Sequence, residues 1–238
     1  MSLILEVCVD SLDAAIHAMK GGADRIEICD RLDKGGLSPG MELVMDIASH
    51  KKYLGLEVDL YAMIRPDDGG TFQYTSKERE EMIADLHRYG SCGVLSGVVF
   101  GMLEESTPGG EIHIDTQSVK TLAFEARRLG LDVTFHRAFD KVTDKCNALE
   151  FLSRECGISR VLTSGDADVA IESINVLRDL VRYCNETLGG RICIMPGSGV
   201  SSENAEYIIR NTGATEIHGS FQGCYKSICA VREVMQHM

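Results

Sequence analysis

The feature that most constrains the fold is a regular alternation of short apolar, β-branched runs with amphipathic helical segments. Strict alternation of this kind implies parallel strands joined by right-handed helical crossovers. Eight runs share 238 residues, so each strand–helix unit has about 30 residues, the size of a βα repeat. The runs are Ile4–Val9, Arg25–Cys29, Asp59–Arg65, Gly97–Met102, Asp132–Arg137, Arg160–Ser164, Arg191–Met195 and Glu216–Gly219.

The segments between the runs carry signals that start a helix. Ser11, Asp115 and Asp144 each precede an apolar stripe with helical spacing, and Thr75 with Glu78 forms a capping box. These signals separate the predicted helices from the predicted strands.

Eight uninterrupted units fit a closed barrel better than an open sheet. A doubly wound sheet is the main alternative, but no Gly-x-Gly-x-x-Gly motif follows the first run. We therefore predict an α/β fold, a single (β/α)8 TIM-barrel domain over residues 1–238.

Composition narrows the class of function. The formal net charge of −12 and the pI near 5.0 argue against a broad surface for nucleic acid or anionic membrane. Nine cysteines, an odd number in a long chain without an evident signal peptide, indicate reduced thiols rather than a disulfide scaffold. No apolar stretch approaches the roughly 18 residues of a membrane span. We predict a cytoplasmic protein with no nucleic-acid or membrane partner.

The pattern Glu-x-Cys occurs twice, at Glu6–Cys8 and at Glu27–Cys29. Residues two apart in a strand share a face, so each Glu lies on the same side as its Cys. If the two runs are neighbouring parallel strands, these four side chains converge at their carboxyl ends. A buried carboxylate is too costly to be accidental unless it is bonded, paired or beside a wet cavity.

Active sites of barrels lie at the carboxyl ends of the strands. The strand ends carry two carboxylates, two arginines and two histidines, which is typical of a small-molecule site. A further carboxylate, Glu216, lies two residues before His218. The alternative is a structural ion network in which both carboxylates pair with the two arginines. The candidate catalytic residues are Glu6, Glu27, Arg65, His136, Arg137 and His218.

Glycine and serine follow the last two runs, where barrels often bind phosphate through backbone N–H groups. The alternative is a strand-to-helix turn that simply needs glycine. The candidate phosphate-binding residues are Gly197, Ser198, Gly199, Gly219 and Ser220.

The thiols of Cys8 and Cys29 suggest a soft metal. Two thiolates are sufficient to hold Cu(I), and thiolate ligands favour that ion. The alternative is that both side chains are ordinary small buried hydrophobes. The chain has no Cys-x-x-Cys motif, so a structural zinc site is not expected.

Seven motifs in consistent order over about residues 5–220 resemble the CutC copper homeostasis family. The resemblance implies a TIM barrel, a cytoplasmic location, a homodimer or homotetramer, and a role in copper homeostasis with Cu(I) bound through Cys8 and Cys29. The family's three-glycine turn reads Gly197-Ser198-Gly199 here. The motifs are Glu6–Ser11, Gly21–Cys29, Met63–Pro66, Val98–Gly101, Val133–Asp140, Arg160–Gly165 and Glu216–His218.

Two functions follow as hypotheses. The first is a cytoplasmic copper homeostasis protein that binds Cu(I) at strand-end cysteines. The alternative is a TIM-barrel enzyme acting on a small anionic or phosphorylated metabolite, in which Glu6 or Glu27 acts as general base, His136 as acid or electrophile, and two arginines hold the anion.

Overall fold

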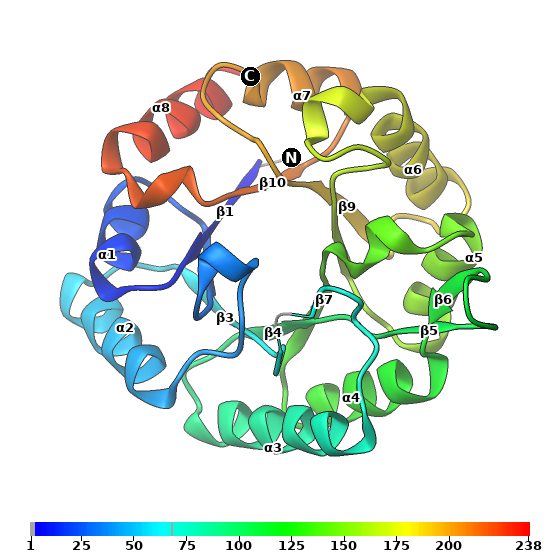
Figure 1. Cartoon of the computed structure of the whole chain (residues 1–238). Coiled ribbons are helices and arrows are strands. Elements are labelled where there is room, and N and C mark those ends of the chain that lie inside the picture. Colours follow the sequence, from blue (N-terminus) through cyan, green and yellow to red (C-terminus); the bar gives the residue numbers. More distant parts are fainter. Residues whose placement is uncertain (1–2, 68) are drawn as a thin grey trace.

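The computed structural model describes residues 3–67 and 69–238. Met1, Ser2 and Asp68 of the predicted domain lie outside the described residues. The strands form a ring and the helices surround it (Figure 1). Eight parallel strands are hydrogen-bonded in the order β10-β1-β2-β3-β4-β7-β8-β9, which confirms the predicted TIM barrel. Their bounds are β1 Ile4–Val9, β2 Arg25–Ile28, β3 Asp59–Met63, β4 Gly97–Phe100, β7 Asp132–Phe135, β8 Arg160–Thr163, β9 Cys193–Pro196 and β10 Glu216–Gly219.

Helices cover the outside of the ring. In the described part of the chain, none of them is long and apolar enough to cross a membrane. The α-helices are α1 Leu12–Lys20, α2 Met41–Leu54, α3 Ser76–Cys92, α4 Thr116–Arg128, α5 Lys145–Glu150, α6 Ile174–Glu186, α7 Ala205–Thr212 and α8 Tyr225–Gln236. Shorter helical turns are η1 Leu32–Lys34, η2 Arg137–Lys141, η3 Phe151–Glu155, η4 Ala170–Ser173 and η5 Phe221–Gly223.

The predicted helix caps are present. Ser11 accepts a hydrogen bond from the backbone of α1, and Asp115 and Asp144 accept from the first turns of α4 and α5. Thr75 and Glu78 form the capping box of α3. Between β4 and α4 the chain also forms a small antiparallel hairpin of β5 (Leu103–Glu105) and β6 (Ile112–Ile114).

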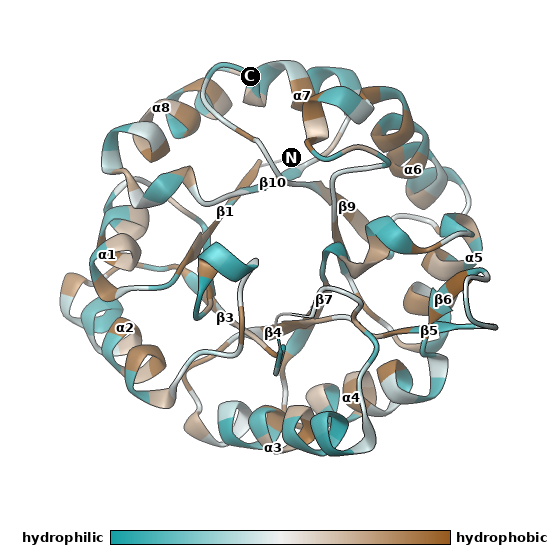
Figure 2. Ribbon diagram, viewed as in Figure 1, coloured by the Kyte–Doolittle hydropathy of each residue, from teal (hydrophilic) through white to brown (hydrophobic). Residues whose placement is uncertain are grey.

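The main apolar core lies between the strands and the helices. Leu5, Val7 and Val9 of β1 belong to it, and they alternate with Glu6 and Cys8. Figure 2 shows the same division, with apolar residues along the strands and polar residues on much of the helical exterior. Since the apolar set faces outward to the helices, the alternate set fills the inside of the barrel.

Strands β9 and β10 stand at the two ends of the hydrogen-bonded order. They are nevertheless adjacent, because a Cβ built on Gly197 would lie 3.3 Å from the Cβ of His218. The ring closes at this seam, where Cys193 Sγ of β9 lies 3.5 Å from Glu216 Oε1 of β10.

Candidate functional site

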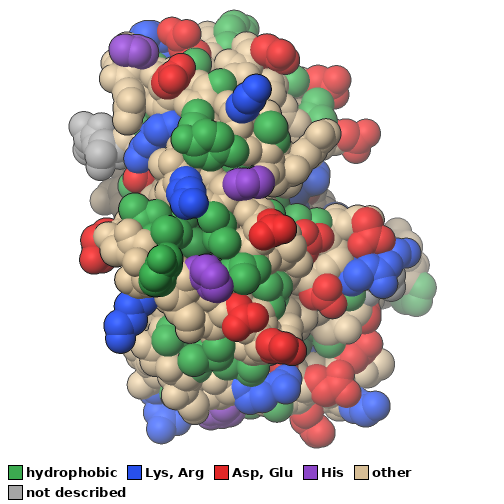
Figure 3. All heavy atoms as spheres, turned by 90° about the vertical axis from the view of Figure 1, so that its left-hand side faces the viewer, with side chains coloured by type: hydrophobic (Ala, Val, Ile, Leu, Met, Phe, Trp, Pro, Cys, Tyr) green, Lys and Arg blue, Asp and Glu red, His purple; other side chains and the backbone are tan. Residues whose placement is uncertain are grey.

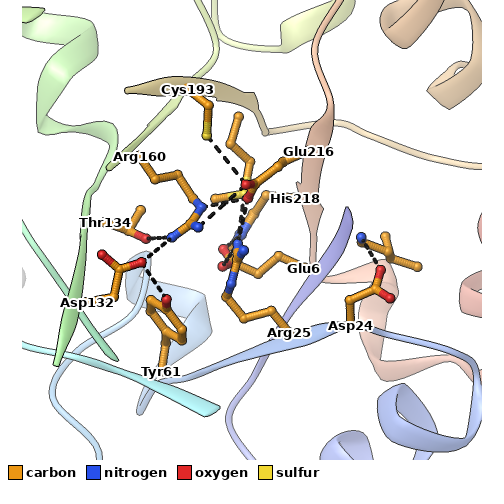
Figure 4. Close-up of polar contacts among 12 residues, drawn as sticks. Glu6, Asp24, Arg25, Tyr61, Asp132, Thr134, Arg160, Cys193, Glu216 and His218 are labelled. Atoms are coloured by element: carbon orange, nitrogen blue, oxygen red, sulfur yellow. Dashed lines mark hydrogen bonds and ion pairs between the residues drawn. The ribbon is translucent and has the colours of Figure 1, made fainter. Parts of the chain in front are cut away.

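The half of the barrel interior at the strand N-termini holds a network of ion pairs (Figure 4). The Arg25 guanidinium lies 3.1 Å from Glu6 and 2.7 Å from Glu216. Arg160 contacts Glu216 through Nε at 2.6 Å. The four side chains are at most 12% exposed, so their charges are compensated mainly by one another.

Tyr61 completes this network from β3. The Cζ atoms of Arg25 and Arg160 lie 5.1 and 5.6 Å from the centre of its ring, within the range of cation–π contacts. Its hydroxyl donates to Asp132 at 2.8 Å. Asp132 is 39% exposed at its side chain, so the network extends from the buried interior to the solvent at that end.

Two expectations are wrong, one about the ion-pair partner of Glu6 and one about the position of Glu216. Glu6 pairs with Arg25, and neither Arg65 nor Arg137 contributes the partner. Glu216 does not lie at the rim, because it is the first residue of β10 and sits one layer below His218. The reason is that residues two apart share a face but differ in depth by about 6.6 Å along a strand.

His218 links this lower network to the upper half of the barrel. Its Nδ1–H donates to Glu6 Oε1 at 2.7 Å, while Glu6 Oε2 accepts from Arg25. Burial would raise the pKa of Glu6, but the hydrogen bond and charge of His218 lower that pKa to about 2. Burial would lower the pKa of His218, but the nearby Cys8 and Glu27 raise it well above its usual range. Because Nδ1 is engaged, Nε2 is the nitrogen of His218 available to a ligand.

Cys8, Glu27 and His218 form a group that could hold a metal ion. One ligand atom from each lies within 4.8 Å of the other two, and all three residues are buried. The strand register explains the grouping, since Cys8 is directly opposite Glu27 on the neighbouring strand. The bond from His218 to Glu6 matches the carboxylate–histidine arrangement that orients metal-binding imidazoles.

Glu27 is the least compensated charge in this group. Burial is the largest influence and raises its pKa to about 7, with a further contribution from the charge of Glu6. Its Oε1 accepts a weak bond from Cys29 Sγ at 3.3 Å, and its Oε2 has no hydrogen-bond partner among the described residues. The carboxyl group can therefore carry or release a proton near neutral pH.

Cys29 follows the last residue of β2, two positions beyond Glu27. It is fully buried, and a Cβ built on Gly36 would lie 3.1 Å from its Sγ. Burial and the charge of Glu27 raise the pKa of the thiol. Cys29 is not part of the three-residue group found among the described residues, although the sequence predicts it as a ligand with Cys8.

A cavity of about 720 Å³ opens above this group at the carboxyl ends of the strands. Of the predicted site residues, Glu6, Gly197 and Cys29 do not line it. The cavity brings together Cys8, Glu27, Arg65, His136, Arg137, Ser198, Gly199, His218, Gly219 and Ser220.

Arg65 and His136 lie on the same wall of the cavity, against Phe72. The Cζ of Arg65 is 5.1 Å from the centre of the Phe72 ring, and the His136 ring is 4.9 Å from it, centre to centre. Burial and the charge of Arg65 lower the pKa of His136 to about 3. The Ala138 N–H donates to His136 Nδ1 at 3.2 Å, so the neutral ring carries its proton on Nε2.

The remaining candidates are more engaged with the protein. Arg137 donates to Asp140 at 2.8 Å and to Ser164 at 3.0 Å, and 42% of its side chain is exposed. The Gly197 N–H donates to the backbone of β8, so it is not free for a phosphate. Ser198 has φ of +74°, a left-handed conformation that glycine adopts more easily.

The sequence interpretation missed Arg25 and Arg160 as interior residues. Both are the first residue of a strand, and each shares a face with the residue two positions later, Glu27 or Leu162, which lines the cavity. Strand parity therefore indicates that both side chains lie inside the barrel, but they lie at the amino ends of their strands, away from the carboxyl ends where a barrel's active site is expected.

The fold and site define a class of protein: a (β/α)8 barrel with a cysteine–carboxylate–histidine group at the floor of a rim cavity. The model of the CutC family matches residues 3–223. The chain belongs to the CutC family, whose members include copper homeostasis proteins.

Individual relatives agree with this assignment. The chain is 40% identical over 217 residues to the human "Copper homeostasis protein cutC homolog", covering 91% of this chain and 72% of the relative. It is 39% identical over 218 residues to a CutC protein of Photobacterium profundum, covering 92% of this chain and 81% of that relative.

Of two similar solved structures, one is a CutC protein and the other shares only the barrel fold. A crystal structure of CutC from Streptococcus agalactiae has a TM-score of 0.78 and 30% identity, covering 92% of this chain and 98% of that one. Thiamine phosphate pyrophosphorylase from Pyrococcus furiosus has a TM-score of 0.61 at 14% identity, covering 99% and 96%. The second likeness supports the barrel fold alone.

Proposed function

We propose that this protein binds Cu(I) as part of copper homeostasis, with Cys8 and His218 as the main ligands and Glu27 beside them. The observation that carries the proposal is the approach of their ligand atoms to within 4.8 Å on the cavity wall. Membership of the CutC family and the name of the human relative support copper as the ion.

The donor set favours a soft ion of low coordination number. Cys8 offers a thiolate and His218 an imidazole, and the thioether of Met63 lines the same cavity. With a pKa of about 7, Glu27 keeps its proton much of the time near neutral pH and is then a poor ligand. Structural zinc sites hold four ligands, whereas a thiolate with an imidazole suits Cu(I).

The ion-pair network of Glu6 and Arg25 orients the His218 imidazole for metal binding. Glu6, fixed by Arg25, accepts the Nδ1–H bond and leaves Nε2 toward the other two ligands. The positive charge of His218 is lost on binding, because an imidazole must be neutral to coordinate a metal. Binding of Cu(I) is therefore expected to release protons.

The test is an anaerobic Cu(I) titration in competition with a chromophoric chelator. Cys8→Ser and His218→Gln should each weaken binding by at least about a hundredfold, the upper range seen for loss of supporting groups around a metal. Cys224→Ser is the control, because Cys224 is an exposed thiol outside the group. Unchanged affinity in Cys8→Ser would disprove the proposal.

Cys29→Ser distinguishes this ligand set from the two-cysteine pair that the sequence predicts. Cys29 is fully buried and lies outside the three-residue group, so its loss should change Cu(I) affinity by less than about tenfold. An effect as large as that of Cys8→Ser would instead support the two-cysteine pair that the sequence predicts, and unchanged affinity in His218→Gln would exclude His218 as a main ligand.

A second candidate function is an enzyme acting on a small anionic or phosphorylated metabolite. It is favoured by Glu27, whose pKa of about 7 and unpartnered Oε2 suit a general base in a cavity. A screen of metabolites by thermal shift, followed by NMR detection of turnover, tests it. The wild type should convert a binder that Glu27→Gln binds but does not convert, and binders that persist unchanged with wild type would refute it.

The predicted cytoplasmic location and oligomeric state belong to the same proposal. All nine cysteines are free, as expected of a reducing compartment. The side of the barrel around α1, α2 and α8 shows apolar side chains among charged ones (Figure 3), and Met45 and Tyr53 of α2 and Tyr225 of α8 are exposed. Light scattering of the purified chain should give the mass of a homodimer or homotetramer, and a monomer at all concentrations would refute it.

A further inference from the structure

Three buried side chains at the cavity present polar atoms without a hydrogen-bond partner among the described residues. These atoms are Glu27 Oε2, Arg65 Nε and His136 Nε2. Each residue is at most 5% exposed. An unpartnered buried polar atom destabilises a folded protein, so three of them on residues around one cavity indicate a ligand that completes their bonds.

Arg65 and His136 offer two N–H donors on one wall. The NH1 group of Arg65 is held at 3.1–3.2 Å by the backbone carbonyls of residues 34–36, which fixes the side chain. Arg65 lines the cavity, and its buried Nε has no hydrogen-bond partner among the described residues. His136 Nδ1 accepts from the Ala138 N–H, so Nε2–H is the free donor of the ring. Both groups pack against Phe72, which places an apolar surface beside them.

Charge and size define what fits these donors. Arg65 supplies the one positive charge at these donors, since His136 is neutral. Arg137 and His218 also line the cavity, but they are paired with Asp140 and Glu6, and the acidic Glu27 and Glu203 lie in the same lining. One negative charge is thus better accommodated than two. The volume of about 720 Å³ far exceeds that of a metal ion and is ordinary for a small-molecule site.

We propose that the cavity binds a small organic monocarboxylate, whose oxygens accept from Arg65 Nε–H and His136 Nε2–H. Its apolar part lies against Phe72 and the apolar residues Met63 and Leu162 of the cavity. This inference deepens the enzyme candidate by naming its ligand class, and it does not depend on metal binding.

The test is calorimetric titration of metal-free, full-length protein with butyrate, butyramide and inorganic phosphate at millimolar concentrations. Butyrate should bind at least tenfold more tightly than butyramide, which has the same shape without the charge, and more tightly than phosphate. His136→Asn, which keeps an acceptor for the Ala138 N–H, and Arg65→Lys should each raise the Kd of butyrate about tenfold to a hundredfold. Arg182→Lys on the surface of α6 is the matched control and should bind like wild type.

Three results would overturn the inference: no binding of butyrate, tighter binding of phosphate than of butyrate, or unchanged butyrate affinity in both cavity variants. Circular dichroism of each variant verifies that the barrel is folded. His136→Asn keeps the test decisive if Arg65→Lys disturbs the backbone of residues 34–36. If butyrate binds but no metabolite is converted, the ligand class stands and the enzyme candidate fails.

Discussion

His136 should make the stability of this protein depend on pH in a way that one substitution abolishes. Burial, with the charge of Arg65, lowers its pKa from the ordinary 6.5 to about 3. Between these values the unfolded chain binds a proton that the folded chain excludes, so the free energy of unfolding falls as the pH falls below 6.5. Each pH unit is worth about 1.4 kcal/mol, which gives a loss of about 2 kcal/mol between pH 7 and pH 5.

His136→Asn removes this titration and keeps an acceptor for the Ala138 N–H. The free energy of unfolding is measured with urea at pH 7, 6 and 5. From pH 7 to pH 5 it should fall by about 2 kcal/mol less in the variant than in wild type, at an unchanged m-value. His237→Asn at the exposed C-terminal end serves as control and should follow wild type. Parallel pH dependence of wild type and His136→Asn would refute the neutral, buried ring on which the carboxylate site depends.

Three further predictions concern the barrel interior and rim. Arg160→Met should cost about 3–5 kcal/mol in urea unfolding, because it leaves a buried carboxylate with one partner fewer, whereas Arg182→Met on the surface should stay within about 0.5 kcal/mol of wild type. Ser198→Gly should be more stable than Ser198→Ala by about 1 kcal/mol, because only glycine adopts φ of +74° freely, and equal stability would contradict this. Gly97→Ala should lower the free energy of unfolding by about 1–3 kcal/mol, because the new Cβ would overlap the Tyr61 ring, and a fall in Tm is the readout.

The sequence predicted the barrel, the helix caps and the face on which the polar residues lie. These depend on local patterns: a period of two in strands, apolar stripes in helices and capping residues before them. The same parity places Cys8 and Glu27 on one face, but the pairing of Cys8 directly opposite Glu27 depends on the register between β1 and β2.

Depth and partners inside the barrel could not be read from the same patterns. Parity assigns Glu216 and His218 to one face but not to separate layers, and the bond from His218 to Glu6 joins residues 212 positions apart. The covering of Cys29 by Gly36 depends on the path of the loop after β2, for which the sequence has no periodic signal. Tertiary contacts of this kind decide which thiol faces the cavity.

The two halves of the barrel interior differ in how far their polar groups are satisfied, and this difference separates structure from function. In the lower half, Glu6 and Glu216 each accept bonds from buried arginine or histidine, as a folded interior requires, and Arg25 Nε is the unpartnered atom of that network among the described residues. In the upper half, Glu27 and His136 keep unpartnered atoms at the cavity. Selection for stability alone would replace such groups by apolar ones of similar shape, which is often neutral or stabilising. Their presence above a compensated network is therefore best explained by ligands that complete their bonds.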